Sequence, residues 1–213
     1  MVIDIRKQFY NHNFLRIMLS WWRCSVEVMD LGRRVLEQQE SRYAEEEDMY
    51  EEEVAQLSSL PTAFENGTWS QEDVEWIIEW KVGPAFVKPV LGYFQNNDDA
   101  VIQEHIERAV HKSSVRDKVE ALTSLSGIGV PVASAVLLFI NPDRFTVIDE
   151  RAWNVLQETG YLAQELSDDP TVDEYLLYLG ACWTLANEYD VSLRTLDRAL
   201  WVLDIKEDRN SSD

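Results

Sequence analysis

The sequence predicts an all-α protein, and three observations lead to that class. Apolar side chains recur at helical spacing through most of the chain, and no segment alternates like a strand over more than a few residues. The composition is 46% apolar with eight Trp among 213 residues, which is too hydrophobic for a disordered chain despite a net charge of −20. We therefore expect a packed helical core.

Helix signals follow one another along the chain. Ser70 with Asp73 three residues later is a capping pattern that starts a helix, and Gly83 followed by Pro84 ends it. Residues 132–140 are apolar on every side, as in a helix that is buried all round. The spacing predicts helices over residues 14–38, 70–82, 97–110, 115–125, 132–140, 149–158, 173–189 and 191–204.

Three segments interrupt this helical pattern. The acidic run of residues 45–53 predicts either a solvated helix or a disordered segment. Pro61, Asn66 and Gly67 mark a loop, and the glycines of residues 127–129 predict a tight turn between two helices.

The charge is unevenly distributed. It sums to +3 over residues 1–36, −14 over 37–110, zero over 111–151 and −9 over 152–213. Taken over the whole chain, such acidity argues against nucleic acid as a partner, because phosphate binding normally draws on Lys and Arg. The neutral window of residues 111–151 nevertheless indicates a surface where added carboxylates would interfere.

The excess of carboxylates also indicates a salt-adapted surface. Only six of the 19 basic residues are Lys, and the acidic residues occupy mostly polar positions of the helical patterns. Self-repulsion of this charge destabilises a compact state in dilute buffer but is screened at molar salt. A halophilic prokaryotic source is therefore our hypothesis.

The cysteine content and the hydropathy of the chain indicate its cellular compartment. Cys24 and Cys182 provide neither a disulfide framework nor a four-Cys metal or iron–sulfur site, which indicates a reducing environment. The apolar segment 14–22 contains Arg16 and does not predict a secretory signal. The longest apolar run, residues 131–140, is about half of a membrane span. We expect a cytoplasmic monomer with no membrane partner.

The most informative segment is residues 122–153. Two glycines allow a turn with positive φ and expose backbone amides at the start of the next helix, which forms an anion site without Lys or Arg. A sharp turn with no ligand at all is the other interpretation of the glycines alone. The landmarks of the segment are Leu125-Ser126-Gly127-Ile128-Gly129, then Ala133, then Val147-Ile148-Asp149 and Trp153.

Together these landmarks resemble the helix-hairpin-helix of the HhH-GPD superfamily of DNA glycosylases, whose hairpin reads Leu-x-Gly-φ-Gly. The resemblance covers about residues 68–160. It implies that the hairpin around Ile128 binds a DNA phosphate and that a K⁺ or Na⁺ ion bridges to it. The implied phosphate-binding amides are those of Gly127, Gly129 and Val132, and the implied cation ligands are the carbonyls of Thr123, Leu125 and Ile128.

The resemblance also implies that Asp149 stabilises the developing sugar cation and orients the attacking water. Asp149 is equally a favoured helix N-cap, and both roles can hold at once. Arg151 would contact a phosphate, with an ion pair to Glu150 or Asp143 as the alternative.

Two departures from the family pattern bear on the chemistry. Pro131 stands where bifunctional members carry the Lys that forms a Schiff base with the sugar. The Cys-rich loop that holds an iron–sulfur cluster in some relatives is also absent, since the C-terminal segment has only Cys182. The sequence therefore predicts a monofunctional enzyme without an iron–sulfur cluster, and no cofactor beyond the hairpin cation.

By the same resemblance, a cleft separates two helical halves. A central bundle of residues 68–146 would carry the hairpin, and the N-terminal segment 1–67 would pack with the C-terminal half, residues 147–213. A base flipped out of the stack needs aromatic walls, for which Trp80, Lys81 and Trp153 are the candidates. Trp at helical spacing also fits a core position.

The predicted function is a monofunctional DNA N-glycosylase of base excision repair, which hydrolyses the bond between a base and deoxyribose. A glycosylase-like DNA-binding protein without catalysis and a helical protein-interaction domain are the alternatives, and RNA could replace DNA as the partner. The sequence does not define the base, because base identity depends on the shape of the pocket.

Overall fold

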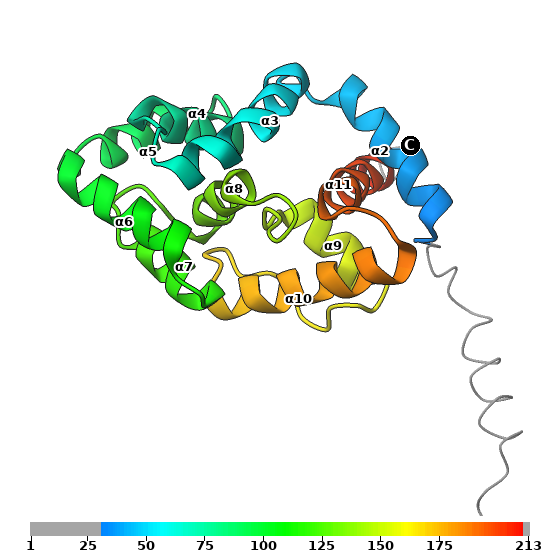
Figure 1. Ribbon diagram of the computed structural model, residues 1–213. Helices are drawn as coiled ribbons and strands as arrows, with labels where there is room; N and C mark the ends of the chain where they lie inside the picture. The colour runs from blue at the N-terminus through cyan, green and yellow to red at the C-terminus, as the bar shows by residue number, and fades with distance from the viewer. Residues whose placement is uncertain (1–30, 211–213) are drawn as a thin grey trace, which may run out of the picture. The chain divides into compact units, whose positions relative to one another are not determined.

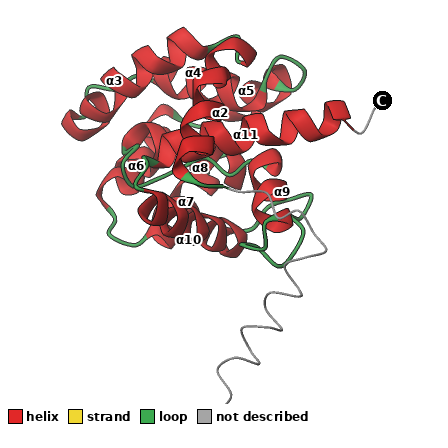
Figure 2. Cartoon of the chain, turned by 90° about the vertical axis from the view of Figure 1, so that its right-hand side faces the viewer, coloured by secondary structure: helices red, strands yellow, loops and turns green. Residues whose placement is uncertain are grey.

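A computed structural model describes residues 31–210, with side chains through residue 204. These residues contain helices and loops and no strand, which confirms the all-α class (Figure 2). The chain divides at Asp30, and the helices described here belong to the unit that begins at Leu31. They are α2 (Arg33–Glu46), α3 (Tyr50–Asn66), α4 (Gln71–Val82), α5 (Val87–Phe94), α6 (Asp99–His111), α7 (Val115–Thr123), α8 (Val130–Ile140), α9 (Glu150–Glu158), α10 (Val172–Tyr189) and α11 (Leu193–Asn210).

Most of the predicted helices are confirmed to within a few residues. Ser70 and Asp73 form the predicted capping box at the start of α4, and Asp149 is the N-cap of α9. The first predicted helix, residues 14–38, falls largely outside the described residues, as does the apolar segment 14–22. Its described part begins α2 at Arg33, which continues to Glu46.

One loop prediction was wrong in part, and one helix was not predicted. The loop expected at Pro61 is helical, because α3 runs through Pro61 and ends at Gly67 in the left-handed conformation (φ 65°). Leu60 and Phe64 of α3 are buried, so packing offsets the backbone hydrogen bond that proline removes. The sequence patterns did not predict α5, an eight-residue helix that contains Pro89. Most of the acidic run is helical, divided between α2 and α3.

Helix α8 is the centre of the core. Every residue of it except Pro131 is buried, as its apolar composition predicted. It packs against α3 and α4 on one side and against α7 and α10 on the other (Figure 1). The helix that follows the hairpin is therefore held firmly by its neighbours.

A second group of helices forms around α11. Helix α2 lies along α11, and α9 packs against α11 as well (Figure 1). The N-terminal segment is thus divided, since α2 joins the C-terminal helices while α3 packs against α8 and α6. None of the described helices combines the length and the apolarity that a membrane span requires.

Candidate functional site

The turn between α7 and α8 is built around Gly127. Its φ of 83° lies in the left-handed region, and a Cβ at this position would lie 2.7 Å from the carbonyl oxygen of Val90 in α5. Asn97 fixes the turn from the other side, because its side chain donates to the carbonyl of Ser126 (3.1 Å) and accepts from the amide of Ser126 (3.0 Å). The hairpin is therefore a rigid element that α5 and the loop after it support.

Several backbone groups of the hairpin have no partner in the described part of the chain. The amides of Gly127, Gly129 and Val132 donate to no acceptor there, and the carbonyls of Thr123 and Ile128 accept from no donor. The carbonyl of Leu125 accepts from the amide of Ile128 at 3.2 Å. These groups fit the anion site and the oxygen ligands of a cation that the resemblance implies.

Asp149 is tied to the hairpin helix through its neighbour. The hydroxyl of Ser134, one turn into α8, accepts a hydrogen bond from the amide of Ile148 at 3.0 Å. Asp149 then caps α9, where its carboxylate accepts from the amide of Arg151 at 3.0 Å. The same carboxylate accepts from the ammonium of Lys81 in α4 at 2.9 Å.

The pKa of Asp149 reflects opposing effects. Burial favours the protonated acid, but the charge of Lys81, its hydrogen bond and the amide of Arg151 outweigh burial, so the pKa lies below its usual value. The side chain still keeps 25% of its surface exposed, against 13% for Lys81. Asp149 is thus an ionised carboxylate that a ligand can reach.

Two hollows meet at Asp149 and Lys81, which line both of them. The larger, of about 350 Å³, lies in the size range of ligand pockets. Its wall includes Pro131 at the start of α8, so the carboxylate and the hairpin helix face the same space. The other lining residues of the larger hollow are Ile148, Glu150, Leu166, Ser167, Asp168 and Pro170.

The loop along the larger hollow is held by Glu174. This carboxylate accepts hydrogen bonds from the amide and hydroxyl of both Ser167 and Thr171, and it forms the capping box at the start of α10. Although burial opposes ionisation, these bonds lower the pKa of Glu174 to about 2. Glu174 therefore fixes the loop that forms one wall of the larger hollow.

The smaller hollow, of about 90 Å³, lies between α4, α11 and α2 and has aromatic walls. Trp80 packs edge-on against Phe139 of α8, with ring centroids 5.2 Å apart. Its indole Nε1 is buried and has no hydrogen-bond partner within residues 31–204. The lining residues are Tyr43, Trp80, Lys81, Val147, Asp149, Arg194, Asp197 and Trp201.

A cluster of buried charged side chains borders the smaller hollow. Glu53 is fully buried and accepts from Arg194 (2.8 Å) and Arg198 (2.6 Å) of α11. Arg194 also pairs with Asp197. Tyr43 completes the cluster by donating to Glu53 at 2.9 Å. Paired in this way, the charges hold α3 and α2 against α11.

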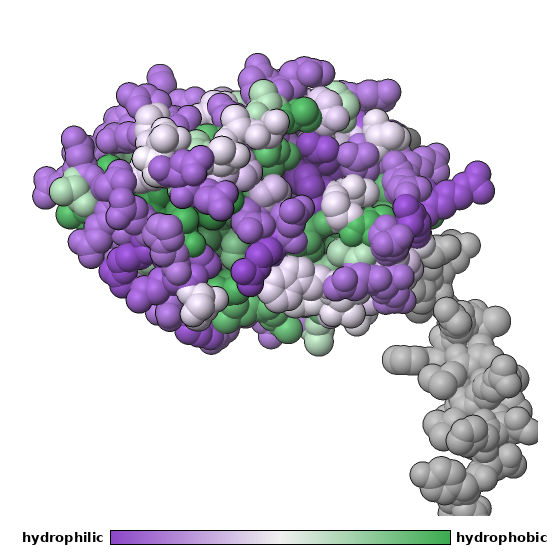
Figure 3. Space-filling model, in the orientation of Figure 1, coloured by the Kyte–Doolittle hydropathy of each residue, from purple (hydrophilic) through white to green (hydrophobic). Residues whose placement is uncertain are grey.

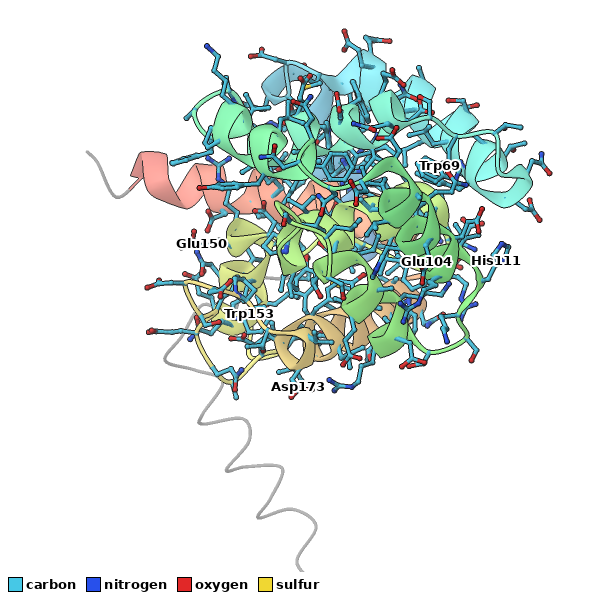
Figure 4. The ribbon with its side chains drawn as sticks, turned by 90° about the vertical axis from the view of Figure 1, so that its left-hand side faces the viewer. Trp69, Glu104, His111, Glu150, Trp153 and Asp173 are labelled. Atoms are coloured by element: carbon cyan, nitrogen blue, oxygen red, sulfur yellow. The ribbon has the colours of Figure 1, made fainter. Side chains whose placement is uncertain are left out.

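The structure brings together some of the predicted site residues and separates others. Trp80 and Lys81 share the smaller hollow with Asp149, whereas Trp153 does not belong to the pocket. Trp153 is fully buried, stacks on Tyr178 with centroids 6.0 Å apart and donates to the carbonyl of Gln164. It is a core residue of α9, while Glu150 of the same helix lines the larger hollow (Figure 4).

Arg151 takes neither of the two partners proposed for its ion pair. Its guanidinium lies over the ring of Trp201, 4.7 Å from the centroid. This contact positions Arg151 between α9 and α11, beside a residue that lines the smaller hollow.

Four residues that shape the site were not among the predicted site residues. Asn97 holds the hairpin, and Tyr43, Trp201 and Asp197 line the smaller hollow. Three of them belong to α2 and α11, far in sequence from the recognised motif, so only the packing of α2 on α11 brings them together. Asp197 had a partial signal, because its spacing to Arg194 predicts a pair on one helix face.

Comparison of the chain with protein-family models, with curated proteins and with solved structures found no match in any of the three.

Proposed function

We propose that this chain is a monofunctional DNA N-glycosylase with a fold of the HhH-GPD type. One observation carries the proposal: Asp149 and the first turn of α8 line the same 350 Å³ hollow, next to hairpin amides that have no acceptor among the described residues. A phosphate bound at these amides would hold a DNA strand beside an ionised carboxylate. A cation on the hairpin carbonyls would add positive charge beside that phosphate.

The proposed reaction is hydrolysis at C1′ of deoxyribose. The bond to the base breaks, the base leaves with the bonding electron pair and takes up a proton, and water adds to C1′. Asp149 stabilises the positive charge that develops on the sugar and accepts a hydrogen bond from the water. The flipped base would lie against the aromatic walls that include Trp80.

Lys81 has a positioning role in this proposal. Its ammonium holds the Asp149 carboxylate in place at 2.9 Å, and no amine is available at Pro131. Water is therefore the nucleophile, and borohydride treatment of a reaction mixture should trap no protein–DNA adduct. If an adduct forms with the wild type and is lost in Lys81→Met, Lys81 and not water is the nucleophile.

The second candidate is a DNA-binding protein without catalysis. It is favoured by the acidic lining of the larger hollow. Glu150 and Asp168 would repel a DNA strand that enters this hollow, while the hairpin could still bind DNA outside it. Binding of lesion-bearing duplexes without release of any base would support this candidate over the glycosylase.

The deciding experiment uses Asp149→Asn, which keeps a side chain able to cap α9. Duplexes that carry uracil, 8-oxoguanine or alkylated bases are incubated at high KCl and then cleaved with alkali. We expect Asp149→Asn to lower excision by on the order of 10²- to 10⁴-fold. Asp169→Asn is the matched control, because Asp169 is exposed and lines neither hollow. Unchanged excision by Asp149→Asn would remove this residue from the mechanism.

A further inference from the structure

Among the residues that the structure describes, the two longest stretches without Asp or Glu lie on either side of α6 and α7. Residues 81–97 carry two Lys and no acidic residue, and residues 121–142 carry no charged residue at all. The first segment includes α5, and the second includes the hairpin and α8. Because α8 is buried, the second stretch contributes acid-free surface mainly at the hairpin, where Ser124, Ser126 and Gly129 are exposed.

The two segments are packed against each other. A Cβ on Gly127 would lie within 2.8 Å of the backbone of Phe94 and 3.2 Å from the Cβ of Tyr93, so α5 lies directly against the turn. Asn97 adds the hydrogen bonds to Ser126. The segments therefore form one continuous acid-free face, which we define as α5 with the hairpin. Glu75, which accepts from Gln95 at 3.1 Å, and Asp98 mark its borders.

Large aromatic side chains project from this face. Phe86 keeps 67% of its surface exposed and Tyr93 keeps 63%, the two highest values among the exposed large apolar residues of the described chain. Lys88, which lies between them in sequence, is also exposed and forms no ion pair within the described part of the chain. The face seen in Figure 3 is mainly hydrophilic, with apolar groups between the polar ones. Large exposed aromatic side chains that stack on no other ring of the described residues indicate a binding surface.

We propose that the acid-free face of α5 binds the DNA strand whose phosphate the hairpin holds. Lys88 contacts a second phosphate of that strand, and the rings of Phe86 and Tyr93 pack on its sugars and unstacked bases. Aromatic rings beside a cation are the combination that binds single-stranded or locally opened nucleic acid irrespective of sequence. Charge complementarity selects this partner, since α5 presents a cation and no carboxylate to a polyanion.

The inference rests on the proposed function for the identity of the DNA, and binding assays test it separately from catalysis. The probe is a fluorescently labelled duplex with one abasic-site analogue, titrated by anisotropy over a series of KCl concentrations. Phe86→Ser and Tyr93→Ser should each weaken binding by about tenfold. Leu177→Ser on α10 is the matched control, because Leu177 is apolar and 48% exposed; its affinity should equal that of the wild type.

The cation is tested by its salt dependence. Lys88→Glu should reduce the slope of log affinity against log salt by about 0.9, the value for one lost phosphate contact. Arg34→Glu on α2 makes the same change of charge at another exposed position and should leave the slope unchanged. Equal effects of the two variants would show that only net charge matters and would overturn the contact at Lys88.

Each failure has its own signature. If Asp149→Asn abolishes excision while Tyr93→Ser binds like Leu177→Ser, the α5 surface is wrong and the proposed function stands. If Asp149→Asn stays active and Tyr93→Ser binds weakly, the reverse holds. Sedimentation tests a second copy of the chain as the occupant: loss of a dimer in Tyr93→Ser with unchanged DNA affinity would overturn the proposal, as would absence of any DNA binding by the wild type.

Discussion

At the scale of single residues, Asp149 combines structural and chemical demands. Its carboxylate caps α9, pairs with Lys81 and opens onto two hollows. A capping side chain contributes about 1 kcal/mol, so Asp149→Ala would lower stability and activity together. Asp149→Asn separates the two, because asparagine caps a helix about as well as aspartate does.

Asp197 is a second carboxylate of the smaller hollow, with the opposite electrostatic balance. Burial raises its pKa to about 6; the charge of Arg194 opposes the rise, and Asp149 and Glu53 add to it. Because the folded-state pKa exceeds the usual 3.8, the protonated acid stabilises the fold. This contribution is fully present below pH 3.8 and is lost as the pH rises through about 6.

We expect Asp197→Asn to remove this pH dependence. The stability of the wild type relative to the variant should fall between pH 3.8 and about 6, by up to about 3 kcal/mol. Denaturant unfolding of both proteins across this range measures the difference, and groups that titrate alike in both cancel. A difference that stays constant with pH would contradict the raised pKa. Such a constant difference in unfolding free energy would reflect only the loss of the Asp197 partner of Arg194.

At the scale of elements, the two hairpin glycines have different requirements. Gly127 has positive φ and lies against the backbone of α5, whereas a Cβ on Gly129 would meet only Pro131, at 3.7 Å. We expect Gly127→Ala to lower the free energy of unfolding by about 2–4 kcal/mol, through backbone strain and the collision with α5. Gly129→Ala should stay within about 1 kcal/mol of the wild type. Urea unfolding measures both.

This difference decides how the hairpin is tested for DNA binding. A side chain at Gly127 would disturb α5 and could abolish binding through the fold alone. Gly129→Glu places a carboxylate beside the unpaired amides and meets no backbone atom. We expect Gly129→Glu to unfold like the wild type and to lose DNA affinity in a gel shift at high salt. Unchanged affinity would show that these amides contact no phosphate.

The elements also show what local sequence can predict. Capping at Ser70 and the all-apolar run of α8 are local signals, and the structure confirmed both helices. Pro61 was interpreted as part of a loop, and α5 with Pro89 was not predicted, but both prolines lie within helices that tertiary packing stabilises. In the candidate site, the resemblance to the glycosylase motif predicted Asp149, whereas its pairing with Lys81, 68 residues away, depends on how α4 packs on α8.

At the scale of the whole molecule, the acidic residues lie mainly at the surface. Glu53, Glu174 and Asp197 are the buried carboxylates of the described chain, and Glu53 and Asp197 form ion pairs with buried arginines. The other acidic residues of the described chain are at least partly exposed to solvent. Salt screens such charges over about 10 Å at 0.1 M and about 3 Å at 1 M. The net charge of −20 therefore bears on stability in salt more directly than on the choice of partner.

We therefore expect the thermal stability to rise steeply as KCl increases from about 0.1 M to about 1 M, because the screening length falls from about 10 Å to about 3 Å over this range. Calorimetry or circular dichroism measures the rise, and sucrose at matched osmolality should not reproduce it. A variant with Glu65→Gln and Glu79→Gln removes two exposed charges near helix C-termini, where negative charge is unfavourable. It should be more stable than the wild type in low salt and equally stable at molar KCl. A wild type that unfolds at the same temperature in dilute buffer and in molar KCl would contradict salt adaptation.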